Sequence, residues 1–115
     1  MKRERKPLIG INRIAWAAKF INRIEEISGV SGIRGGGRFR KISDIRCMAI
    51  THLSNECNLS MRRTAILCGL INHSSVYHAK LKFETLIEVD KPFRQLAELI
   101  GKDERIKDLE SRIKA

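Results

Sequence analysis

Apolar residues recur at steps of three and four along most of this 115-residue chain, which is the spacing of one face of an α-helix. No segment alternates apolar and polar residues with the period of two that is typical of a half-buried strand. A chain of this length forms one small domain, and 43% hydrophobic residues suffice for a modest core. The sequence therefore predicts an all-α fold.

The stripes and the residues that flank them predict five helices. They cover residues 8–27, 42–57 and 61–68, a stretch from 73 to Asp90, and an additional C-terminal helix within 91–115. Ser43, Ser60 and Asn72 are suited to cap the second, third and fourth helices, and Gly69 to end the third. Pro92 suits the first turn of the fifth helix.

A glycine-rich stretch separates the first two helices. Residues 28–41 contain five glycines and four cations, and so many glycines exclude a regular element. Since neither flank can bury a core alone, we expect a loop within one domain rather than a linker between two.

The whole chain has a net charge of +10, and the positive charge is concentrated in its first two thirds. Residues 1–46 carry twelve basic and four acidic side chains, residues 47–82 four and one, and residues 83–115 seven and eight. An excess of this size in a small domain indicates a polyanionic partner. We therefore expect a polyanion to contact the first two of these segments, and the last third to serve another purpose.

The short third helix, the turn at Gly69 and the longer fourth helix have the outline of a helix-turn-helix. In that motif the second helix inserts its first turns into the major groove, where short polar side chains reach base edges and flanking cations hold phosphates. Residues 72–75 are short or polar, and Arg62, Arg63, Lys80 and Lys82 supply flanking charge.

The sequence Asn-His-Ser-Ser-Val-Tyr-His-Ala at 72–79 resembles the Asp-His-Thr-Thr-Val-x-His-Ala signature of the C-terminal DNA-binding domain of DnaA, the bacterial chromosomal replication initiator, a Trp-repressor-like helix-turn-helix. The segments at 46–49 and 60–69 are similar to that domain's Arg-Gln-x-Ala helix and its short helix. The resemblance covers roughly residues 8–87. The chain departs from the family at Asn72 (Asp there), Ile71 (Arg) and Arg62 (Pro).

The resemblance implies sequence-specific binding of double-stranded DNA. We therefore divide the chain into a DnaA-like DNA-binding domain at 1–90 and an amphipathic C-terminal helix at 91–115. The resemblance places Arg38 in the minor groove and Asn72, His73 and Ser74 at bases in the major groove. Residues expected at or near phosphates are Arg40, Arg46, Ser60, Ser75, His78 and Lys82. Arg62 joins them on its charge alone.

Catalytic and metal chemistry find little support in the sequence. Cys47, Cys57 and Cys68 are an odd number without a C-x-x-C pair, which favours reduced thiols in a core. Together with the histidines they match no common zinc spacing. Acids are scarce between residues 30 and 83, which argues against hydrolytic carboxylates. We expect no enzyme, metal, cofactor, small-molecule substrate or membrane partner.

We therefore expect a cytoplasmic DNA-binding protein, nucleoid-associated or acting in a host cytoplasm, that serves replication initiation or its control in a bacterium or phage. Two alternatives remain: a helix-turn-helix transcriptional regulator, and a basic helical adaptor for an acidic protein. In the last third, Leu99, Ile106 and Ile113 repeat every seven residues. This repeat fits either packing on the domain or a homodimer through 92–115.

Overall fold

The computed structural model describes residues 5–35, 39–70 and 74–114, with side chains from residue 13 onward. Its elements are α1 (Arg5–Ser28), a short 3-10 turn η1 (Ile33–Gly35), α2 (Arg40–Asn55), α3 (Met61–Leu67), α4 (Ser74–Val89), α5 (Lys91–Lys102) and α6 (Glu104–Lys114). No strand occurs within these ranges. The all-α prediction is confirmed.

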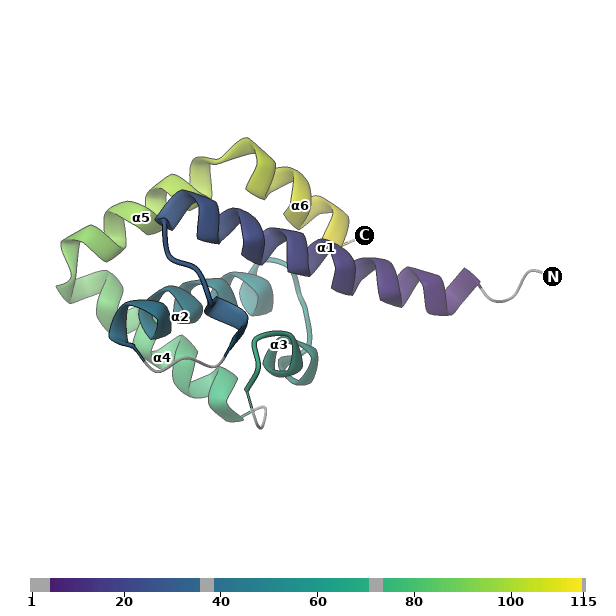
Figure 1. The fold of residues 1–115 in the computed structure, drawn as a ribbon, viewed down its shortest axis with the longest axis horizontal. Coiled ribbons are helices and arrows are strands. Elements are labelled where there is room, and N and C mark those ends of the chain that lie inside the picture. The colour runs from purple at the N-terminus through teal and green to yellow at the C-terminus, as the bar shows by residue number, and fades with distance from the viewer. Residues whose placement is uncertain (1–4, 36–38, 71–73, 115) are drawn as a thin grey trace.

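Helices α1 and α6 pack against each other, as do α2 and α4, and both pairs contribute to one core. Helix α1 runs along one side of the molecule, and α6 returns beside it in the opposite direction (Figure 1). Helix α2 packs against α4, α3 lies against both, and α5 connects α4 to α6. Within the described ranges, none of the helices combines the length and the apolar character needed to cross a membrane.

The core takes apolar side chains from every one of these helices. The largest fully buried ones are Phe20, Ile21, Ile24, Ile33, Met48, Ile50, Leu53, Val76, Ile100, Ile106, Leu109 and Ile113. Residues of α1 and α6 therefore belong to the same cluster as residues of α2 and α4.

Of the three predicted caps, Ser60 is confirmed, Ser43 is wrong, and Asn72 lies outside the described residues. Ser60 caps α3, its hydroxyl accepting the Arg63 amide at 3.1 Å. Asp90 caps α5 through the Phe93 amide, also at 3.1 Å, with a proline in the first turn. Helix α2 instead begins after Phe39, which provides no side-chain cap, so Ser43 lies inside the first turns of the helix.

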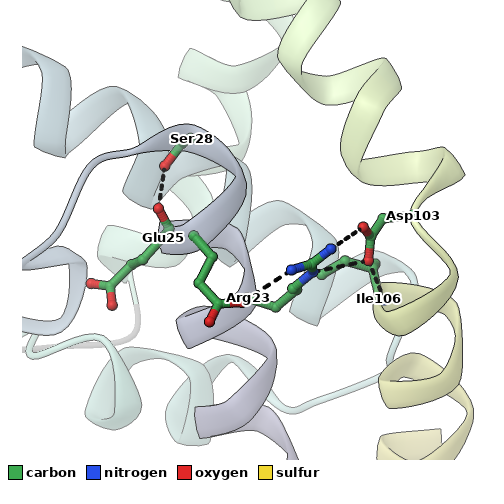
Figure 2. Close-up of polar contacts among 6 residues, drawn as sticks. Arg23, Glu25, Ser28, Asp103 and Ile106 are labelled. Carbon is green, nitrogen blue, oxygen red and sulfur yellow. Dashed lines mark hydrogen bonds and ion pairs between the residues drawn. The ribbon is translucent and has the colours of Figure 1, made fainter.

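The C-terminal segment forms two helices rather than the single one predicted, because the chain breaks at Asp103. The Asp103 carboxylate accepts the Ile106 amide at 2.9 Å and so caps α6. It also accepts two hydrogen bonds from the Arg23 guanidinium, at 2.7 and 3.2 Å (Figure 2). The break therefore combines a local cap at Ile106 with a partner on α1, eighty residues earlier in the chain.

The heptad residues of the last third have different environments. Ile106 and Ile113 are fully buried in the core cluster, where α6 packs along α1, whereas Leu99 on α5 is 60% exposed. The stripe of α6 is therefore covered within the chain. A dimer through this segment would have to use the exposed side of α5.

Candidate nucleic-acid interface

Helix α3 and the turn that follows it have a well-defined local geometry. After Leu67 the chain turns at Gly69, whose φ is +73°. The Gly69 amide donates to the Ile66 carbonyl at 3.2 Å, and the Leu70 amide donates to the Ala65 carbonyl at 2.8 Å. This pair of hydrogen bonds is the Schellman arrangement, which favours glycine at the left-handed position. The predicted end of the third helix at Gly69 is confirmed.

Helix α4 presents one face to the core and another to solvent. Val76, Ala79 and Leu86 are buried, while Tyr77 is 55% exposed and His78 is exposed beside it, their rings 5.8 Å apart. This solvent-facing side of α4, together with the adjoining part of α2, is called here the α2–α4 face.

A pocket of about 200 Å³ opens between α2 and α4 on this face. Four of the residues predicted to contact phosphate line it: Arg46, Ser75, His78 and Lys82. Ser43 lines it as well. Ser75, His78 and Lys82 are three and four residues apart on α4, so one helical face brings them together, while Arg46 comes from α2.

Arg46 is largely buried, with 8% of its surface exposed. Its Nε donates to the Ile33 carbonyl at 2.7 Å. Burial of an arginine is unfavourable unless its charge is paired or hydrogen-bonded. Arg46 therefore also holds η1 against α2, a structural role that the sequence did not indicate.

Two further contacts hold η1 in place. The Ile33 amide donates to the Glu25 carboxylate at 3.1 Å, and Arg34 Nε donates to the Leu67 carbonyl at 3.0 Å, at the end of α3. The glycine-rich stretch at 28–41 thus contains a short 3-10 turn, where no regular element was predicted, and this turn is tied to α1, α2 and α3. Sequence reasoning missed Glu25 and Arg34 as anchors, because their partners are eight and thirty-three residues away.

Lys82 already has protein partners at the edge of the pocket. Its ammonium lies 3.0 Å from the Ser43 hydroxyl and 3.1 Å from Asp44 Oδ1. The other oxygen of Asp44 lies 4.0 Å from Arg40 Nε. Asp44 was not among the predicted site residues, although its spacing of four from Arg40 is that of an ion pair on one helix face.

The remaining predicted residues lie in several places. Arg40, Arg62 and Ser74 are exposed, and the hydroxyl of Ser60, although exposed, serves the cap of α3. Arg38, Asn72 and His73 lie outside the described residues.

The cysteines lie in the core as free thiols. Burial raises the pKa of Cys57 to about 12 and that of Cys68 to about 11, and it also raises the pKa of Cys47. A thiol with a raised pKa is protonated at neutral pH and is a poor nucleophile. Among the described residues, no three His, Cys, Asp or Glu side chains are grouped as metal ligands would be.

His52 illustrates a structural use of a histidine. Its Nε2 lies 3.1 Å from Glu110 Oε2 and so links α2 to α6. Burial lowers the pKa of His52 and raises the pKa of Glu110. We take the contact at neutral pH as a neutral imidazole that donates to the carboxylate.

Comparison with protein families, with curated proteins and with solved structures found no match to this chain.

Proposed function

We propose that this protein binds double-stranded DNA, with α3 and α4 acting as a helix-turn-helix and α4 as the recognition helix. The observation that carries the proposal is the α2–α4 pocket, where hydroxyl and imidazole groups lie on the exposed side of α4 and the Lys82 ammonium is shared with Asp44 and Ser43. Such groups are common phosphate ligands in protein–DNA interfaces. The resemblance of residues 72–79 to the DnaA signature supports the same assignment.

The distribution of charge along the chain supports an approach of DNA from the side of α3 and α4. The excess of cations lies in residues 1–82, which include α1, α2, α3 and about half of α4, while the segment containing α5 and α6 is close to neutral. Helix α6 packs on α1, so it is not part of the α2–α4 face. A DNA duplex would therefore approach from the side of α3 and α4.

The resemblance further favours a role in replication initiation or its control over a role in transcription. The departure at Asn72 affects a position that meets a base in the family, so we expect the target site to differ from a family-type origin box. Selection of bound duplexes from a random pool, followed by footprinting on the selected site and on an origin box, tests this assignment.

Binding to a random-sequence duplex, followed by fluorescence anisotropy, tests the proposal with paired charge variants. Arg62 on α3 and Arg105 on α6 are both exposed. We expect Arg62→Ala to weaken binding several-fold, because it removes a cation beside the proposed interface, and Arg105→Ala to have a much smaller effect at about 0.15 M salt, where charges farther than roughly 8 Å are screened. Equal effects of the two variants would contradict the proposed orientation.

A further inference from the structure

Asp44 is an acidic residue within the most basic part of the chain. Only one other acid, Glu56, occurs between residues 30 and 83. Glu56 lies exposed at the end of α2, whereas the Asp44 side chain is 14% exposed and lies at the α2–α4 face. A negative charge at this position opposes the binding of a phosphate, and so it calls for a physical explanation.

The contacts of the Asp44 carboxylate show how its charge is compensated. Oδ1 is buried and accepts no hydrogen bond of good geometry from the described residues, but the Lys82 ammonium lies 3.1 Å away. A buried carboxylate is unfavourable unless a cation is paired with it. Arg40 contributes at 4.0 Å and is itself exposed. Lys82 is therefore the main counter-ion of Asp44.

This pairing determines how much of the Lys82 charge is available to a ligand. The Lys82 side chain is 41% exposed and lines the pocket with Ser75 and His78. Its ammonium is shared between Asp44 and the Ser43 hydroxyl. A phosphate that enters the pocket and approaches Lys82 would also lie close to the Asp44 carboxylate, and the two like charges would repel each other.

We propose that Asp44 is an internal counter-charge that neutralises Lys82 and so lowers the affinity of the α2–α4 pocket for a backbone phosphate. This inference rests on the proposed function, and it adds a residue that limits how strongly the protein is retained on DNA of any sequence. Through this pair, the protein binds duplexes less tightly, and with less sensitivity to salt, than its formal charge predicts.

The test compares Asp44→Asn with the wild-type protein in binding to a random-sequence duplex over a series of salt concentrations. The substitution keeps the shape of the side chain and releases the Lys82 charge. We expect binding to become about three- to ten-fold tighter at about 0.1 M salt. The slope of log affinity against log salt should become steeper by about one, since one more phosphate is neutralised.

Asp108→Asn is the matched control. Asp108 pairs with Arg112 on α6 at 3.0 Å, so this substitution also removes one acid from an ion pair and raises the net charge by one. We expect it to change the slope by much less than one. If Asp108→Asn strengthens binding as much as Asp44→Asn does, the effect comes from net charge alone and the inference is overturned.

The double variant Asp44→Asn with Lys82→Gln gives an independent readout, because it removes one negative and one positive charge and so leaves the local net charge unchanged. We expect it to bind within about two-fold of wild type with the wild-type slope. A large loss of affinity would show that Lys82 serves the DNA despite Asp44, and this result would overturn the inference even if Asp44→Asn does not fold.

The outcomes separate this inference from the proposed function. If the wild-type protein binds duplexes with a steep salt dependence and Asp44→Asn binds no more tightly, only the role of Asp44 is refuted. If the wild-type protein binds no duplex at low salt, both are refuted.

Discussion

Helix α6 should be essential for the stability of the whole domain, and Ile113→Ala tests this expectation. Ile113 is fully buried in the cluster that α1 and α6 share. Truncation of a buried isoleucine to alanine costs about 2–5 kcal/mol, the transfer term together with the cavity that remains. We take about 3 kcal/mol, a large part of the 5–15 kcal/mol typical of the total stability of a domain. The melting temperature should then fall by about 12 °C, at roughly 4 °C per kcal/mol for a chain of this size.

Trp16 provides the assay, since it is the only tryptophan in the chain. Lys19 Nζ on α1 and Arg112 Cζ on α6 each lie 4.8 Å from its ring centroid. Fluorescence therefore reports on the packing of α6 against α1, while circular dichroism reports on all the helices. The two transitions should coincide in Ile113→Ala, because one cooperative unit unfolds.

Leu99→Ala is the control for this prediction, because Leu99 is exposed on α5 and its truncation should change stability by less than about 0.5 kcal/mol. If Ile113→Ala is as mild as Leu99→Ala, α6 is not part of the core. If the fluorescence change precedes the loss of helical signal, α6 is a separate unit, and the division into residues 1–90 and 91–115 then has an energetic meaning.

Three further predictions concern local features of the fold. Asp103→Asn retains a good capping residue but loses the ion pair with Arg23. That hydrogen-bonded pair holds the pKa of Asp103 below its usual value. The pair therefore stabilises the wild type above about pH 4, and this contribution is lost as pH falls through the lowered pKa. Acid denaturation should therefore show a shallower loss of stability in Asp103→Asn, and identical acid limbs would contradict this. Gly69→Ala should lower the free energy of unfolding by about 1–2 kcal/mol, since φ is +73° there. Gly101→Ala within α5, where an added Cβ meets nothing within 4 Å, should raise it by about 0.5–1 kcal/mol. Equal effects in thermal melts would refute the assigned backbone geometry. The three buried thiols should react with a thiol reagent only as the chain unfolds, because burial keeps them protonated and covered, and rapid labelling of the native protein would contradict this.

Features that depend on neighbouring residues could be predicted from the sequence. The cap at Ser60, the end of α3 at Gly69 and the proline in the first turn of α5 each depend on residues only a few positions apart. For the same reason, the shared face of Ser75, His78 and Lys82 follows from their spacing on one helix. Local chemistry decides these features, whatever the rest of the chain does.

Features that depend on distant partners could not be predicted. The ion pair that holds the break at Asp103 comes from Arg23, eighty residues earlier, although the cap on Ile106 is local. The role of Asp44 depends on Lys82, thirty-eight positions later in the sequence. Likewise, Arg46 was predicted for DNA phosphate, but its Nε is bound to the Ile33 carbonyl. In each case a contact between elements, invisible in the local pattern, determines what the side chain does.

The salt dependence of wild-type binding to a random-sequence duplex tests the central claim most directly. Each phosphate neutralised by the protein releases counter-ions and contributes about −0.9 to the slope of log affinity against log salt. With about five phosphates neutralised by cations other than Lys82, the account predicts a slope of about −4 to −5. A flat response, or no binding to duplex DNA at low salt, would contradict the account and favour a basic adaptor that docks on an acidic protein.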